Sequence, residues 1–285
     1  PRAAGASPAA VRGDAEGGAR DDGAAEFFQA GIEDLGADDV AAADARAIAD
    51  AAGILAACLP ETAFAVTLGD QAIFEAVVGA LGLPGGWQKR LIQTFGNHTR
   101  LDALLETLAR PQPVAGLDRR VAAYLADGDE AGLVGHIAAT MDATGYSTNA
   151  SRGPEEIARR LKEKLALSVT SLDADALTAL RAFLALEVPL SQAGDALGAF
   201  AEKFGLDIAG AIAVFARRIE ALEATGTNIA AVTYRAAFGR PLDYYTGLVF
   251  EISEKGPRAA LLAGGGRYDR LLTLLGLLGS PNIAS

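Results

Sequence analysis

A long helical stretch between two strand-forming segments is the feature that most constrains the fold of this chain. From about residue 84 to residue 225 the apolar pattern is almost wholly helical. Helix starts are marked near Thr99, at Pro154 and near Thr170, which predicts five or six helices of unequal length. Strand patterns flank this stretch on both sides. We therefore predict an α+β chain in which a helical insertion interrupts a sheet domain.

The flanking segments alternate strands and helices. Before the insertion, alternating or short apolar runs predict a half-buried strand over 26–35, a helix over 41–59, a buried strand over 62–68 and a helix from Asp70 to Leu81. After it, we predict strands over 228–234, 248–252 and 259–262 and a helix over 268–278. The predicted units are a loop or disordered segment (1–25), a first core half (26–83), the insertion (84–206) and a second core half (207–285).

Composition excludes several classes of partner. A net charge of −11 and a pI near 4.7 are poor for binding phosphate backbones, so no nucleic-acid partner is predicted. No uninterrupted apolar run is long enough to span a membrane, and the first residues lack the basic-then-apolar order of a signal peptide, so neither a span nor a signal peptide is predicted. The single cysteine, Cys58, lies in an apolar helical stretch and is predicted to be buried, which fits a cytoplasmic protein. His98 and His136 lack neighbouring ligands, so no metal site is predicted.

Two polar motifs near the end of the chain suggest a binding pocket. The first, R-P-L-D-Y-Y-T-G-L-V-F, begins at Arg240, and the second, A-G-G-G-R-Y-D, begins at Ala263. Arginine can hold a carboxylate, tyrosines can supply hydrogen bonds, and glycine lets backbone approach a ligand, so a small zwitterion would fit. Each motif also has a plainer interpretation, since a tyrosine pair often packs in a core and a glycine run often forms a turn or bulge.

Taken together with F-F-Q-A-G-I-E from Phe27, these motifs resemble the histidyl-tRNA synthetase family of class II synthetase-like proteins. The resemblance covers residues 26–82 and 207–278 and implies an antiparallel sheet core with flanking helices. It also implies that the bound amino acid is histidine. The residues that match the family's histidine pocket are Gln29, Glu33, Arg240, Tyr244, Tyr245, Gly265 and Tyr268.

The family has a synthetase branch and a regulatory branch, and the sequence resembles the second. Arg12 and Arg20 lie among acidic residues, which is unfavourable for a triphosphate, and Pro241 replaces the glycine of the synthetase motif. The segment from 68 to 84 is also similar to the regulatory subunit of ATP phosphoribosyltransferase. A synthetase or related amino-acid-activating enzyme remains the alternative, and a helical scaffold without a ligand is a third interpretation.

The regulatory resemblance implies a function without catalysis. The chain would bind the catalytic subunit of a short-form ATP phosphoribosyltransferase, which joins ATP to phosphoribosyl pyrophosphate in the first step of histidine biosynthesis. It would dimerise through its synthetase-like core within a hetero-octamer, and histidine would act as the feedback ligand. We predict no catalytic residue and no cofactor.

Overall fold

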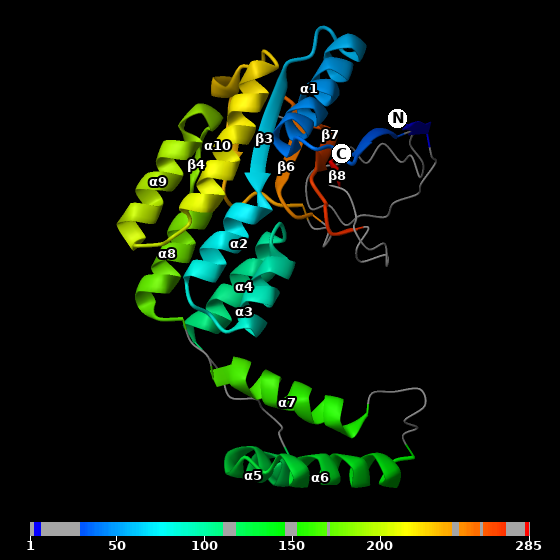
Figure 1. The fold of residues 1–285 in the computed structure, drawn as a ribbon, viewed down its shortest axis with the longest axis vertical. Coiled ribbons are helices and arrows are strands. Elements are labelled where there is room, and N and C mark those ends of the chain that lie inside the picture. The colour runs from blue at the N-terminus through cyan, green and yellow to red at the C-terminus, as the bar shows by residue number, and fades with distance from the viewer. Residues whose placement is uncertain are drawn as a thin grey trace.

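Two β-sheets and ten helices make up the part of the chain that this computed structural model describes, which comprises residues 3–6, 29–110, 118–145, 153–169, 172–240, 245–256, 259–271 and 283–284 (Figure 1). A five-stranded sheet has the order β4-β5-β3-β6-β7, and a three-stranded sheet has the order β1-β2-β8. The strands are β1 (Ala3–Ala6), β2 (Ala30–Leu35), β3 (Phe64–Asp70), β4 (Glu187–Pro189), β5 (Val232–Arg235), β6 (Leu248–Glu254), β7 (Leu261–Gly266) and β8 (Ile283–Ala284).

The large sheet joins segments from both sides of the helical insertion. Strand β3 pairs in parallel with β5, with Val66 opposite Val232, and antiparallel with β6, with Leu68 opposite Phe250. The β4–β5 and β6–β7 pairs are antiparallel. The sheet is thus antiparallel apart from one pair. That parallel pair can form because the crossover between its strands contains the whole insertion.

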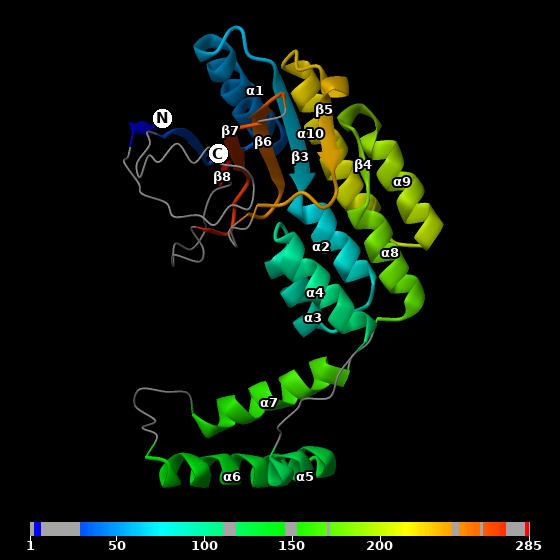
Figure 2. The ribbon, with the colours of Figure 1, turned by 180° about the vertical axis from the view of Figure 1, so that it is seen from behind.

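The helices are α1 (Val40–Cys58), α2 (Gln71–Ala80), α3 (Gly85–Thr94), α4 (His98–Ala109), α5 (Arg119–Asp127), α6 (Glu130–Ala143), α7 (Pro154–Val169), α8 (Ala174–Leu184), α9 (Ala193–Phe204) and α10 (Ala209–Ala224). Helices α1 and α10 lie side by side against one face of the large sheet, as the opposite views in Figures 1 and 2 show. None of the helices in the described ranges combines the length and apolarity needed to cross a membrane.

Side-chain caps fix where many of these helices begin. The Asp39 carboxylate accepts a hydrogen bond from the Ala42 amide at α1, and Asp70 accepts from the amides of Ala72 and Ile73 at α2. Such caps satisfy backbone donors that have no partner inside the helix. The predicted cap at Asp70 is therefore confirmed.

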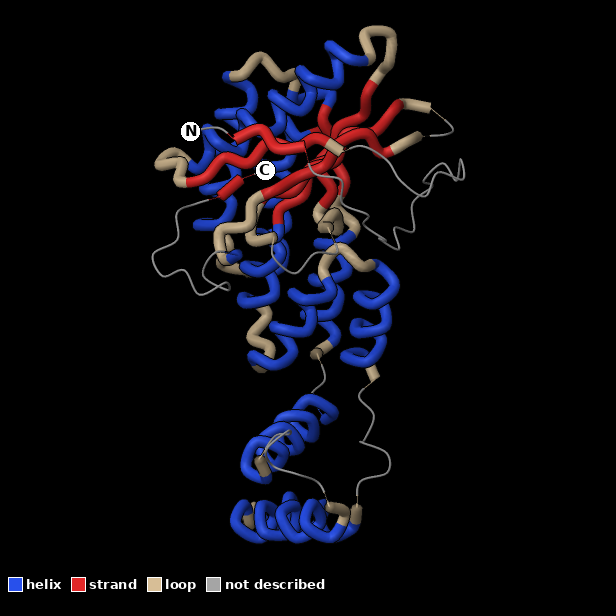
Figure 3. The backbone as a smooth tube through the Cα atoms, turned by 90° about the vertical axis from the view of Figure 1, so that its right-hand side faces the viewer, coloured by secondary structure: helices blue, strands red, loops and turns tan. Residues whose placement is uncertain are grey.

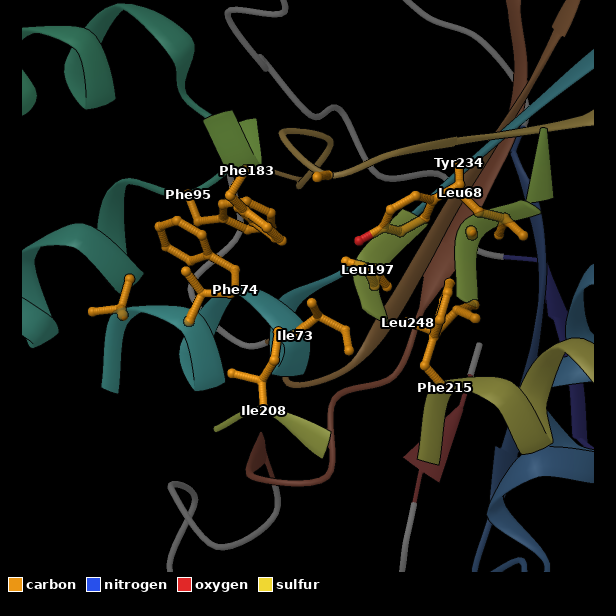
Figure 4. Packing of buried hydrophobic residues seen from close by; sticks show 14 of the residues in the cluster. Leu68, Ile73, Phe74, Phe95, Phe183, Leu197, Ile208, Phe215, Tyr234 and Leu248 are labelled. Atoms are coloured by element: carbon orange, nitrogen blue, oxygen red, sulfur yellow. The ribbon is translucent and has the colours of Figure 1, made fainter. Parts of the chain in front are cut away.

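The helices of the insertion pack into two separate apolar cores. Helices α3, α4, α8 and α9 contribute to the main core beside the large sheet, where Phe74 stacks on Phe95 with 4.2 Å between ring centroids (Figure 4). Helices α5, α6 and α7 form a second unit around Leu133, Ile137, Met141 and Ala158. This unit lies away from the sheets in Figure 3. Trp87 is buried in the main core.

Several sequence predictions need correction. Residues 3–6 form β1 in a segment predicted to lack regular structure, and eight helices, α3 to α10, lie where five or six were predicted. Strand β2 was predicted to be half-buried, but Ile32 and Leu35 are exposed, because β2 contributes no side chain to the main apolar core of the described residues. Cys58 is exposed rather than buried, because it lies at the C-terminal end of α1.

In the second half of the core, the strand and helix bounds also differ from the predicted ones. The third predicted strand runs over Leu261–Gly266, so the glycine run is part of β7 rather than a turn. Strand β5 begins at Val232 because Asn228 caps a short 3-10 turn over Ile229–Ala231. The helix predicted over 268–278 falls mostly outside the described residues.

Candidate functional site

The loop after β5 contains Gly239 and Arg240 and passes close to Gly69 and Gly96. A Cβ atom at Gly69 would overlap the Phe238 carbonyl oxygen, and a Cβ at Gly96 would lie 2.6 Å from the Gly239 carbonyl carbon. At Gly239 itself a Cβ would come within 2.6 Å of the Phe95 ring. The loop therefore lies too close to the ends of β3 and α3 for a side chain at these positions. Glycine at the three positions lets the loop, and with it Arg240, lie there.

The Arg240 side chain lies beside β6 and β7. Its Nη1 donates to Glu251 Oε1 at 3.2 Å, and the guanidinium covers the backbone of Gly264. The Arg240 Nε is buried and has no hydrogen-bond partner among the described residues. Burial raises the pKa of Glu251, although the positive charge of Arg240 opposes this shift. Burying a hydrogen-bond donor without a partner destabilises the folded protein, so Arg240 is suited to bind an additional anionic group.

Two predicted tyrosines pack together next to this arginine. Tyr245 and Tyr268 are buried, and their rings meet edge to face with 6.3 Å between centroids. The Tyr245 ring lies close to Gly266, where a Cβ would come within 2.9 Å of it. Gly265, opposite Phe250 in the β6–β7 pair, is buried. The structure thus brings Arg240, Tyr245, Gly265 and Tyr268 to one region of the sheet.

A small polar pocket opens beside Arg240 and Tyr245. Its volume is about 90 Å³. It lies between α2, α3 and the segments that precede β6 and follow β7, and it is lined by Gln71, Glu75, Ile92, Gln93, Phe95, Arg240, Tyr245 and Arg270. Arg270 donates to both Glu75 carboxylate oxygens, at 3.5 and 3.1 Å. Sequence reasoning missed Gln71, Glu75, Gln93 and Arg270, because only the fold brings α2 and α3 against the second motif.

The remaining predicted site residues lie elsewhere or are not described. Gln29 and Glu33 belong to the segment of β2 in the small sheet, and both are exposed. Partial desolvation nevertheless raises the pKa of Glu33. Tyr244 lies outside the described residues. The seven-residue histidine site accordingly stays a prediction.

The structure also contains a buried ion network that the sequence did not predict. Arg267, which precedes Tyr268 in the sequence, donates from Nε to Asp44 Oδ1 at 2.8 Å and from Nη1 to Asp269 at 2.6 Å. Arg218 donates to Asp70 Oδ2 at 2.6 Å, and its Nε lies 2.9 Å from Asp44 Oδ2 without hydrogen-bond alignment. Burial raises the pKa values of Asp44 and Asp70, against the arginine charges.

A larger hollow lies in the second helical unit but has no feature of the predicted site. Its volume is about 350 Å³, and its lining includes Tyr124, Leu125 and Leu133. Of its three charged groups, Lys162 and Glu130 pair at 2.9 Å, and the Asp129 carboxylate accepts a hydrogen bond from the Gly132 amide. In the described ranges, no group of three or more His, Cys, Asp or Glu side chains could hold a metal ion. The pocket beside Arg240 is therefore the candidate functional site.

Comparison with curated proteins decides the family. The chain is 61% identical over 257 residues to the ATP phosphoribosyltransferase regulatory subunit of Agrobacterium fabrum, and the match covers 90% of this chain and 68% of that protein. The chain belongs to the ATP phosphoribosyltransferase regulatory subunit family. It is also 62% identical over 257 residues to the subunit of the same name from Allorhizobium ampelinum, covering 90% and 69% of the two chains.

The same comparisons confirm the predicted fold and branch. The family model described as histidyl-tRNA synthetase matches residues 130–277. The crystal structure of histidyl-tRNA synthetase from Nostoc sp. PCC 7120 matches with a TM-score of 0.55 and 14% identity, covering 91% of this chain and 47% of that one. This likeness supports the class II synthetase-like fold alone, and the chain spans about half of that structure. The two regulatory subunits are 61% and 62% identical to the chain, whereas the Nostoc synthetase is 14% identical.

Proposed function

We propose that this chain acts as the non-catalytic regulatory subunit of a short-form ATP phosphoribosyltransferase, in the first step of histidine biosynthesis. The observation that carries the proposal is the 61% identity to a regulatory subunit over 90% of the chain. The partner is then the catalytic subunit, which the chain would activate on assembly. We further propose a cytoplasmic hetero-octamer in which this chain dimerises through its sheet core.

We also propose that free histidine is the regulatory ligand. Arg240 and the two buried tyrosines Tyr245 and Tyr268 supply a cation and an aromatic surface in one region. The Glu33 carboxylate on β2 can accept from an imidazole N–H, and the Gln29 amide can complete the hydrogen bonds. Histidine would then inhibit by binding one conformation of the complex more tightly than the other.

Reconstitution with the catalytic subunit tests the main proposal. The chain is mixed with a short-form ATP phosphoribosyltransferase from the same source, and complex formation and reaction rate are measured with and without histidine. We expect co-elution, a higher rate in the complex and inhibition by histidine. A rate that does not change when a complex forms would refute the regulatory function. Histidine-dependent exchange of pyrophosphate into ATP would instead favour the synthetase alternative.

The Glu33→Ala variant tests the ligand site. We expect weaker histidine inhibition and unchanged assembly, because one charge-assisted hydrogen bond is lost, worth roughly 1.5–3 kcal/mol. Tyr245→Phe should have a milder effect of the same kind. The control is Asp38→Ala, which removes an exposed carboxylate in the turn that follows β2. Equal inhibition of Glu33→Ala and Asp38→Ala would count against Glu33 as a histidine ligand.

A further inference from the structure

We propose that Glu75 on α2 and Arg240 read the two charged groups of the amino acid, with Glu75 taking the α-ammonium group and Arg240 the α-carboxylate. This inference rests on the proposed binding of histidine. It adds to the predicted site a residue from a helix that carries neither motif. It also gives the pocket beside Arg240 a specific task, which is to distinguish an intact amino acid from analogues that lack one charged group.

The shape of the pocket places both groups around one small space. Glu75 and Arg240 both line the cavity of about 90 Å³, together with Tyr245. The Glu75 side chain is 21% exposed and that of Arg240 is 20% exposed, so each is mostly covered by protein while still facing the cavity. Mostly desolvated charges discriminate ligands more strongly than fully solvated ones.

The charges around the pocket favour a zwitterion over a polyanion. Arg240 pairs with Glu251, and Arg270 pairs with Glu75, so the two positive and two negative charges balance. A triphosphate or pyrophosphate group would gain no net attraction in such surroundings. An amino acid carries one charge of each sign. Its two charged groups can replace one partner in each of these ion pairs, so that no charge in the pocket is left uncompensated.

Each ion pair has one feature that lets a ligand exchange into it. The Arg270 side chain is 63% exposed, so water can solvate it when an ammonium group takes its place at Glu75. Within the described ranges the buried Arg240 Nε has no hydrogen-bond partner, so a carboxylate that approaches Arg240 would satisfy this donor. Gln71, whose Nε2 lies 3.5 Å from both Glu75 Oε1 and the Ile92 carbonyl, makes only long contacts and can adjust.

Three ligands separate the two charged groups in a titration experiment. The full chain is titrated in a calorimeter with histidine, with imidazolepropionate, which lacks the ammonium group, and with histamine, which lacks the carboxylate. We expect the wild-type chain to bind histidine more tightly than either analogue. In Glu75→Gln, the preference for histidine over imidazolepropionate should fall by about tenfold or more, while the preference over histamine remains.

The matched control is Arg270→Gln, which breaks the same Glu75–Arg270 pair but keeps the Glu75 carboxylate. It should retain the full preference for histidine over imidazolepropionate. An equal loss in both variants would overturn the proposal, since the pair would then be structural. If Glu75→Gln kept the full preference for histidine over imidazolepropionate, the assignment of Glu75 would also be wrong. Histidine binding by that variant would still support the proposed function.

Two further outcomes complete the test. If the folded wild-type chain binds no histidine, the proposed histidine-binding function fails, and this inference fails with it. If inorganic phosphate or ATP competes with histidine for the pocket of the wild-type chain but not of Arg240→Gln, the pocket is an anion site and the zwitterion assignment is wrong. Circular dichroism melting of each variant verifies that the comparison is made between folded proteins.

Discussion

The guanidinium of Arg240 lies directly against the backbone of Gly264, in the space that a Cβ atom at position 264 would occupy. Gly264 lies on β7 opposite Glu251 on β6, and Glu251 is the carboxylate that pairs with Arg240. A glycine of the second motif therefore determines where the arginine of the first motif can lie. A glycine in one strand makes room for an arginine that arrives from a loop more than twenty residues earlier.

We expect Gly264→Ala to displace Arg240 and weaken histidine binding by about tenfold, which corresponds to about 1.4 kcal/mol. The added methyl group overlaps Arg240 Nη1 and also comes within 3.3 Å of Glu251 Cγ, so the ion pair must move. Calorimetric titration measures the affinity. Gly198→Ala in α9 is the control, because nothing lies within 4 Å of a Cβ there. Histidine binding by Gly264→Ala at wild-type affinity would show that Arg240 need not keep this position.

The sequence predicted local features well because their physical causes are local. Asp70 was predicted as a helix cap, and its carboxylate caps α2. The same carboxylate also pairs with Arg218, which is 148 residues away in sequence, and no local pattern indicates such a partner. The pocket shows the same limit, since Glu75 and Arg270 meet only after the helical insertion returns the chain to the sheet.

The sequence also could not predict very short strands or how deeply each strand is buried. Strand β4 has three residues and includes Pro189, so its apolar pattern is too short to recognise. The glycine run in β7 gives no strand signal by itself, and it is extended because it pairs with β6. Alternation in β2 correctly predicted a strand, but burial depends on what covers the strand, and Leu35 is 60% exposed.

The network around Asp44 should be important for stability. We expect Asp44→Ala to lower the free energy of unfolding by about 3–5 kcal/mol, because buried Arg267 and Arg218 would lose a shared carboxylate. Urea denaturation measures the change. Asp34→Ala removes a partner of Arg46 in an ion pair whose side chains are 30% and 48% exposed, so it should cost at most about 1 kcal/mol. Equal costs for the two variants would contradict a special contribution from the buried network.

Removal of the Tyr234 hydroxyl group should increase stability, in contrast to removal of the Asp44 carboxylate. Its hydroxyl is buried without a hydrogen-bond partner in the described structure, and the side chain is 1% exposed. Tyr234→Phe removes this uncompensated group and keeps the ring that packs on Phe215. We expect the free energy of unfolding to rise by about 1 kcal/mol at neutral pH. A loss of stability in the urea experiment would imply that the hydroxyl has a partner.

The same residue should affect stability at alkaline pH. Burial, and then the negative charge of Asp70, raise the pKa of Tyr234 above its ordinary value of about 10. Above that pH the unfolded chain loses the tyrosine proton while the folded chain keeps it, so stability falls as pH rises. The advantage of Tyr234→Phe over the wild type should therefore grow above about pH 10, by up to about 1.4 kcal/mol per pH unit. An advantage that stays constant above about pH 10 would contradict this expectation.

The second helical unit should unfold without the sheets, because its core is separate from the main one. Leu133, which is 1% exposed, forms a cluster with Ile137, Met141 and Ala158, and among the described residues this cluster is separate from the main one. Leu133→Ala should cost this unit about 2–5 kcal/mol. Amide hydrogen exchange should then speed up in α5, α6 and α7, while β3 and β6 keep their protection. Leu180→Ala, in the main core, should instead reduce protection of the strands. If Leu133→Ala lowered protection equally in β3 and in α6, the two cores would unfold as one cooperative unit.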